Sequence, residues 1–205
     1  LDLALVTEER LAEEMWAYPY NTMRFQALAR AATRLVLLLD ADFLVSDGFR
    51  AEALRPASWA ALLAATHARR QALVLPAFET RAGLELEEGA ATAAAAAAAD
   101  KRGLKRLFDA GDVTRFAPFY RRGHSATDYK RWFASPAGYE VVPETGYEPY
   151  LLLSRLHVPW FDERFRGCVS YNALEFIHIY DKTLPACSPP TAAPPTALQP
   201  PPTHL

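Results

Sequence analysis

Amphipathic segments alternate with short apolar runs along the first part of the chain. Residues 7–15, 21–33 and 58–70 carry apolar side chains at helical spacing, which predicts three helices. Residues 35–39 and 72–76 are largely aliphatic runs between polar positions. Such runs are typical of strands buried on both faces, as in a parallel sheet covered by helices. The alternation predicts an α/β fold with a doubly wound sheet.

The amino-acid composition changes twice in the middle of the chain. Residues 90–99 are almost pure Ala, the residue with the highest helix propensity, and they predict a surface helix without functional content. Residues 114–160 are dense in aromatic side chains, Pro and Gly. This texture predicts a lid or ligand-binding region of loops and short strands, with strand-like pieces at 139–142 and 150–153.

The last part of the chain divides into a helical and a Pro-rich segment. Residues 169–182 predict one more helix, whereas residues 184–205 are rich in Pro, Ala and Thr and predict a disordered tail. Of the 205 residues, 51% are hydrophobic and 12% are aromatic. Residues 1–183 are therefore expected to form one domain with a substantial core.

Charge and cysteine content exclude several classes of protein. A formal net charge of −2 without a basic stripe argues against a nucleic-acid partner. No run reaches the about 18–20 apolar residues that cross a bilayer, so no transmembrane segment is expected in this chain. Cys168 and Cys187 are too few for a disulfide framework or a zinc site.

Two carboxylates, Asp40 and Asp42, follow the first apolar run directly. Residues two apart in an extended chain point to the same side, so both side chains can converge on one cation in a partly desolvated crevice at the strand's end. Hard oxygen donors without a nearby His or Cys favour Mg²⁺ or Mn²⁺, which leave positions open for a diphosphate. This chemistry is typical of a nucleotide-sugar transferase. The alternative is a solvated acidic turn, as expected for the pair Glu85 and Glu87.

Six segments, in order along residues 18–181, resemble motifs of the LARGE-type glycosyltransferases of sequence family 49. The segments are Tyr18-Pro19-Tyr20-Asn21-Thr22-Met23-Arg24, Leu39-Asp40-Ala41-Asp42-Phe43-Leu44, Val74-Leu75-Pro76-Ala77-Phe78-Glu79-Thr80, Gly123-His124-Ser125-Ala126-Thr127-Asp128-Tyr129 closing on Trp132, Gly146-Tyr147-Glu148-Pro149-Tyr150, and Phe161-Asp162-Glu163-Arg164-Phe165. Any one of them can arise by chance, whereas the ordered set is specific to the family.

The resemblance implies a GT-A-like (Rossmann-like) mixed sheet flanked by helices, and Mn²⁺ or Mg²⁺ at Asp40 and Asp42. It also implies a UDP-sugar donor, most plausibly UDP-glucuronate, and a glycan or glycoprotein acceptor. The family usually resides in the Golgi lumen behind a type II membrane anchor. Residues 164–179 depart from the family pattern, which lacks three of these residues and has a second Gly. Together with an expected strand upstream of Leu1 and a His-containing segment downstream, this predicts a domain that is incomplete at both ends.

Three residues are candidates for donor binding in view of the resemblance. Asn21 and Arg24 lie near the start of the second predicted helix, and Arg offers planar recognition of phosphate and carboxylate. Their alternative is helix capping and a surface charge. His124 either contacts donor or acceptor, or packs as an ordinary histidine among aromatic side chains.

The candidate catalytic bases are Glu148 and Asp162. An inverting transfer needs a base within hydrogen-bond reach of the acceptor hydroxyl. Glu148 is preferred, because its aromatic surroundings can raise its pKa. The alternative is that either carboxylate is a structural partner of Arg164. Glu175 is a third possibility in the divergent segment.

The aromatic candidates for sugar stacking are Tyr129, Trp132 and Trp160, and we expect Trp160 to lie in the core. Taken together, the sequence predicts a metal-dependent glycosyltransferase. The alternatives are a catalytically inactive or truncated module with a glycan-binding or interaction role, and a phosphate-ester hydrolase. The hydrolase would need further metal ligands, and none is well placed in the sequence.

Overall fold

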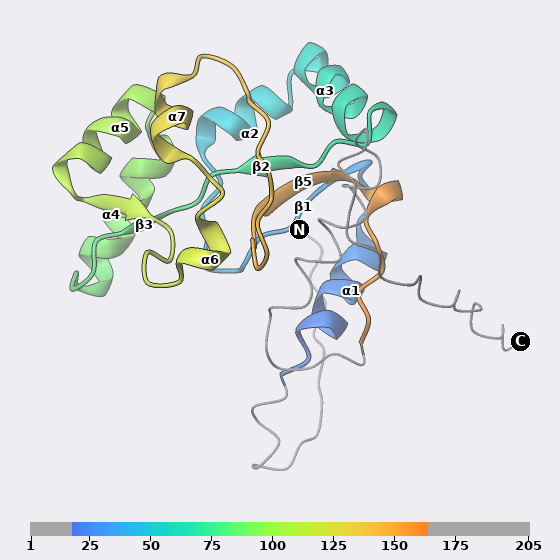
Figure 1. Ribbon diagram of the computed structural model, residues 1–205, viewed down its shortest axis with the longest axis horizontal. Coiled ribbons are helices and arrows are strands. Elements are labelled where there is room, and N and C mark those ends of the chain that lie inside the picture. Colours follow the sequence, from blue (N-terminus) through green and yellow to red (C-terminus); the bar gives the residue numbers. More distant parts are fainter. Residues whose placement is uncertain (1–17, 164–205) are drawn as a thin grey trace, which may run out of the picture.

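The computed structural model describes residues 18–163 (Figure 1). The first helix, α1 (Tyr20–Arg30), carries the chain to strand β1 (Leu35–Leu37). The prediction of a helix over 21–33 is confirmed, although the helix ends earlier because Ala31 takes an extended conformation. The predicted helices at 7–15 and 169–182, and the predicted tail, lie outside the described residues.

The main sheet has three strands in the order β1-β5-β2. Strand β5 (Tyr150–Ser154) lies in the centre and pairs antiparallel with both β1 and β2 (Leu73–Leu75). Consequently β1 and β2 run in the same direction, and the chain between them forms α2 (Asp47–Ala53), α3 (Pro56–Leu63) and a π-helical turn, η2 (Ala64–Ala68). Helices and sheet together confirm the α/β class. The three-residue strands replace the longer runs expected at 35–39 and 72–76.

The expectation that the first apolar run is a parallel strand buried on both faces is wrong. Leu35 is buried, but Val36 and Leu37 are only partly so, and the partner strand β5 runs antiparallel. Within residues 18–163, β1 has a neighbour on one side alone and is therefore an edge strand. The strand that is buried over most of its length is β5, where Leu151 to Ser154 all lie in the interior.

The core lies between β5 and α1. Leu28 of α1 packs with Leu151, Leu153, Val158 and Phe161, all of which are buried. Figure 1 shows α1 on one side of this sheet and α2 and α3 on the other. Each fully buried Leu side chain contributes about 1.5–3 kcal/mol, so this small cluster fixes the helix against the strand.

A second, two-stranded sheet joins β3 (Phe78–Thr80) to β4 (Val113–Arg115). Between these strands the chain forms the Ala-rich helix α4 (Leu86–Ala98) and helix α5 (Lys101–Ala110), so the predicted helix at 90–99 is confirmed. Phe78 packs against Phe108 of α5 and against the aromatic side chains of α7 (Tyr129–Ala134). The sequence pattern predicted the strand around Phe78 only through the family motif.

The aromatic region beyond β4 contains loops and short elements, as expected. It forms the single turn α6 (Arg121–His124), then α7, β5 and the 3-10 turn η3 (Arg155–His157). The strand-like piece at 150–153 is confirmed as β5, whereas residues 139–142 form no strand. None of the helices in the part of the chain that the structure describes is both long and apolar enough to cross a bilayer.

Candidate functional site

Asp40 and Asp42 lie at the carboxyl end of β1, in the turn that follows it. The backbone N–H of Leu38 donates to the carbonyl of Leu151 at 3.1 Å, and the chain leaves the sheet after that bond. The turn closes with a hydrogen bond of 3.3 Å from the Phe43 N–H to the Asp40 carbonyl. Both carboxylates are exposed, so the partly desolvated crevice expected for them is not observed.

The Asp40 carboxylate is held by side chains from two other elements. The hydroxyl of Tyr150, at the start of β5, donates to Oδ2 of Asp40 at 2.8 Å. Nη2 of Arg24, on α1, lies 3.9 Å from Oδ1. Burial, and then the Asp40 carboxylate itself, raise the pKa of the Tyr150 hydroxyl, so Tyr150 stays a donor at neutral pH. The ion pair with Arg24 is partly exposed and contributes little to stability.

An aromatic cluster supports the Tyr150 ring. Phe43 lies 4.6 Å and Phe116 5.8 Å from Tyr150, centroid to centroid, and His124 stacks on it at 6.2 Å. His124 is buried and also packs edge-on against Phe116 at 5.0 Å. Burial lowers the pKa of His124, and the Asp40 charge opposes this shift. These contacts match the packing alternative for His124, and its contact with a donor stays a prediction.

Glu148 lies in the same neighbourhood. Its N–H donates to the carbonyl of Gly123 at 2.7 Å, and the Tyr120 hydroxyl lies 3.5 Å from its Oε1. Burial raises the pKa of Glu148, in the direction that the sequence predicted. The Tyr120 hydrogen bond and the Arg24 charge lower this pKa, and the Asp40 charge raises it. Arg24, Asp40 and Glu148 therefore belong to one electrostatic cluster.

Asn21, which lies on α1 together with Arg24, contacts Asp162. The Asn21 side chain is fully buried, and its Nδ2 donates to the backbone carbonyl of Asp162 at 2.7 Å. The residue that caps α1 is Pro19. Asn21 thus ties the start of α1 to the segment after η3. The neighbouring Phe161 ring lies 5.9 Å from the Arg24 guanidinium, which links this contact to the cluster. Arg164 lies outside the described residues.

The carboxylate pair fits a hard divalent cation. Two exposed oxygen donors suit Mn²⁺ or Mg²⁺, which keep water and substrate oxygens as further ligands. Within residues 18–163, no group of three or more His, Cys, Asp or Glu side chains is arranged to hold a metal. Any additional ligand would come from the substrate, from water or from outside this range.

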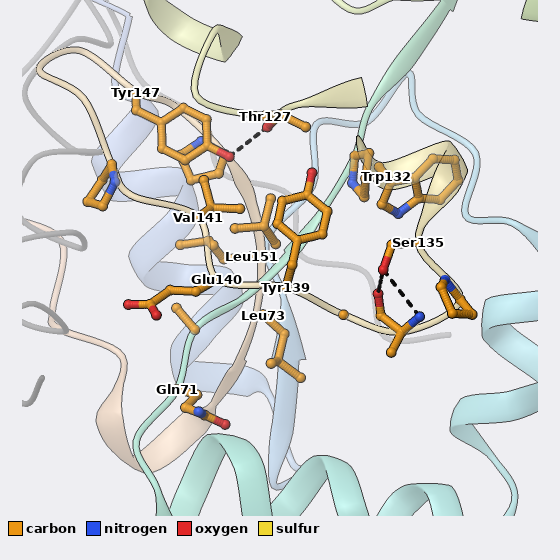
Figure 2. A pocket seen from close by; sticks show the side chains of 18 of the residues that line it. Gln71, Leu73, Thr127, Trp132, Ser135, Tyr139, Glu140, Val141, Tyr147 and Leu151 are labelled. Atoms are coloured by element: carbon orange, nitrogen blue, oxygen red, sulfur yellow. Dashed lines mark hydrogen bonds between the residues drawn. The ribbon is translucent and has the colours of Figure 1, made fainter. Parts of the chain in front are cut away.

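A cavity of about 840 Å³ lies on the other side of the segment that carries Glu148 (Figure 2). Strand β2 forms one wall and residues 135–143 form another. Tyr147 and Leu151 line the cavity, whereas Glu148 and Tyr150 do not. The alternation of an extended chain therefore separates the cavity from the cluster at Asp40. None of the candidate catalytic, donor-binding or metal-ligating residues lines this cavity.

The three aromatic candidates have different environments. Tyr129 is buried, and its hydroxyl donates to the carbonyl of Ala77 at 2.7 Å. Trp132 lines the cavity and lies under the ammonium group of Lys101, at 4.4 Å. Trp160 is 66% exposed, so the expectation of a core position is wrong. Its ring lies tilted against that of Phe25 of α1, at 5.2 Å between the centroids.

Sequence reasoning missed the contacts of Tyr120 and Tyr150. Tyr150 follows Glu148 by two positions, and residues two apart on an extended chain share a side. That spacing was sufficient to place the Tyr150 hydroxyl beside the site. No comparable signal marks Tyr120, because its contact with Glu148 depends on the turn of α6.

The sequence profile of the family described as "Glycosyl-transferase for dystroglycan" matches residues 4–179. The chain belongs to this family. The predicted resemblance to LARGE-type glycosyltransferases is thereby confirmed, and the family consists of glycosyltransferase enzymes.

Three relatives illustrate the match. The xylosyl- and glucuronyltransferase LARGE2 of Rattus norvegicus is 38% identical over 151 residues, or 73% of this chain and 20% of the relative. LARGE2 of Homo sapiens is 36% identical over 156 residues, which are 73% of this chain and 19% of the relative. LARGE1 of Mus musculus is 31% identical over 152 residues, which are 73% of this chain and 18% of the relative. The chain thus spans about a fifth of the length of these family members.

Proposed function

We propose that this chain has a GT-A-like fold and transfers a sugar, most plausibly glucuronate, from a UDP-sugar to a glycan hydroxyl with inversion. The observation that carries the proposal is the convergence of Arg24, Asp40, Glu148 and Tyr150 from three separate elements. The family and the printed activities of its relatives, xylosyl and glucuronyl transfer, support the reaction class.

Asp40 and Asp42 would hold a divalent cation, Mn²⁺ or Mg²⁺. When bound, the ion neutralises charge on the leaving diphosphate as a Lewis acid. Tyr150 fixes the orientation of the Asp40 carboxylate through its hydrogen bond. Arg24, whose guanidinium lies 3.9 Å from Asp40, would contact the diphosphate or a donor carboxylate. Asn21, which lies on α1 with Arg24, and His124, which stacks on Tyr150, would also shape the donor site.

Glu148 would act as the general base. Its carboxylate takes the proton of the acceptor hydroxyl as that oxygen bonds to the anomeric carbon and the bond to the UDP oxygen breaks. A pKa raised by burial brings Glu148 closer to the pH at which a carboxylate base is most effective. Asp162 is the second candidate, and its backbone carbonyl accepts a hydrogen bond from Asn21 on α1.

By analogy with the family, the acceptor would be a glycan or glycoprotein, and the site of action the Golgi lumen behind a type II anchor. The rival function is an inactive glycan-binding or interaction module. The lack of a third protein ligand among residues 18–163 is the observation that favours that rival.

The decisive experiment measures UDP release from UDP-glucuronate with and without Mn²⁺, using the chain and its Asp42→Ala variant. The matched control is Asp109→Ala, which removes an exposed carboxylate that pairs with Lys105 on α5. Metal-dependent release that is lost in Asp42→Ala alone supports the transferase. Binding of UDP without any turnover supports the module, and equal release from both variants overturns the role of the carboxylate pair.

A further inference from the structure

Gly123 leaves room for the ring of Tyr120. A Cβ atom at position 123 would lie 2.7 Å from both Cδ1 and Cε1 of that ring, well inside van der Waals contact. The turn of α6 brings the two residues together, because the Gly123 N–H donates to the Tyr120 carbonyl at 3.2 Å. Any larger side chain at 123 would therefore displace the Tyr120 ring from its present place.

The same glycine also anchors Glu148. Its carbonyl accepts the Glu148 N–H at 2.7 Å, which fixes the backbone of the carboxylate relative to the turn. The Tyr120 hydroxyl lies 3.5 Å from Oε1 of Glu148. Gly123 thus determines both ends of this contact, the position of the Tyr120 ring and the position of the Glu148 backbone.

We propose that Tyr120 is a positioning residue for Glu148, and that the absence of a side chain at Gly123 is what allows it. The hydroxyl restrains one carboxylate oxygen and leaves the other free for an acceptor proton. The catalytic meaning of this restraint rests on the proposed function, whereas the contact itself does not. Tyr120 lies on the rim of the site, and the neighbouring Phe119 is 88% exposed, so this side is open to an acceptor.

The charged and titratable groups that act on Glu148 define what each substitution does. Tyr120 and Arg24 stabilise its ionised form, whereas burial and Asp40 oppose ionisation. The variant Tyr120→Phe removes one stabilising donor and keeps the ring, so the pKa of Glu148 should rise further. Gly123→Ala should produce the same rise, because the displaced ring carries its hydroxyl away from the carboxylate.

The test is a pH titration of the Glu148 carboxyl by NMR, in the full chain labelled with ¹³C-glutamate. Glu148→Gln identifies the signal. The matched controls are Tyr139→Phe, which loses a hydroxyl directed to the Asp128 carbonyl, and Gly48→Ala, where the added methyl meets no atom within 4 Å. We expect higher midpoints in Tyr120→Phe and Gly123→Ala, no further rise in the double variant, and unchanged midpoints in both controls.

An unchanged midpoint in Tyr120→Phe overturns the proposal, and it does so even if Gly123→Ala fails to fold. A raised midpoint in Tyr120→Phe but not in a folded Gly123→Ala overturns the role of the glycine. In the transfer assay, Tyr120→Phe should move the acidic limb of the rate profile to higher pH and lower kcat about fivefold, the equivalent of one neutral hydrogen bond. If the unmodified chain releases no UDP, the proposed function fails while the titration still decides this inference.

Discussion

The Tyr150 hydroxyl donates a hydrogen bond of 2.8 Å to Oδ2 of Asp40. This bond joins the central strand β5 to the turn after the edge strand β1, and it uses one of the two oxygens that the carboxylate offers. Asp40 is exposed, and it also forms an ion pair of 3.9 Å with Arg24. Among residues 18–163, the Tyr150 hydroxyl therefore makes the shorter of these two contacts and orients the candidate metal ligand.

Replacing Tyr150 by Phe should weaken metal binding without unfolding the chain. The ring would keep its packing with Phe43, Phe116 and His124, while Asp40 would lose its orienting bond. Loss of such a supporting bond costs roughly 10–100-fold in metal affinity. A calorimetric titration of both proteins with Mn²⁺ checks this prediction. An affinity equal to that of the unmodified chain would contradict it.

The stability of the chain should fall as the pH drops below the ordinary range of histidine, in part because of His124. Burial lowers the pKa of His124 below its usual value of 6.5. As the pH falls, the unfolded state therefore takes up this proton before the folded state does. The contribution of neutral His124 to the free energy of unfolding is present above pH 6.5 and is lost as the pH falls through the pKa of the folded state. Urea unfolding at a series of pH values should show a smaller loss in His124→Phe. Parallel curves for both proteins would rule the contribution out.

The sequence predicted the positions of α1, α3 and α4 and of the two aliphatic strands better than the pairing of those strands, and it did not predict α2, α5, α6 or α7. The runs at Leu35 and Leu73 were identified from their composition, and the strand between them, β5, was predicted as a strand-like piece at 150–153, but nothing in the sequence placed it between the other two. Strand order depends on long-range contacts, and the local pattern of an apolar run carries no information about its partner. The parallel assignment failed for this reason.

The candidate site was predicted in part. The motifs named Arg24, Asp40 and Glu148, and the structure brings these three together. The exposure of Asp40 was not predictable from its place after a strand, because it depends on which neighbours cover the turn. The contact of Tyr120 with Glu148 was not predicted either. It depends on the Tyr120 ring lying where a side chain at position 123 would be, and the motif does not show this.

Leu153 should be the most costly position in β5 to truncate. Its side chain is fully buried at the centre of the cluster that includes Leu28 and Phe161. Leu153→Ala removes this packing and leaves a cavity, at a cost of about 2–5 kcal/mol in the free energy of unfolding. The control Leu156→Ala, at a site that is 69% exposed, should change stability by less than about 0.5 kcal/mol. Urea denaturation of both variants checks the contrast, and equal losses would show that β5 is not the core strand.

Removing one partner of the buried hydrogen bond between Thr127 and Tyr147 should cost more stability than the loss of the bond itself, because the other hydroxyl is left unpaired. Their hydroxyls lie 2.6 Å apart at the cavity wall, both side chains are buried, and burial raises the pKa of Tyr147 to about 12 (Figure 2). Thr127→Val leaves the Tyr147 hydroxyl without this partner and should cost about 1–3 kcal/mol, and Tyr147→Phe should cost a similar amount. Replacing both removes the unpaired group, so the double variant should lose less stability than the sum of the two. A double-mutant cycle by urea denaturation measures the difference. Strict additivity would mean that water replaces the missing partner in each single variant, and that the wall of the cavity is open to solvent at this point.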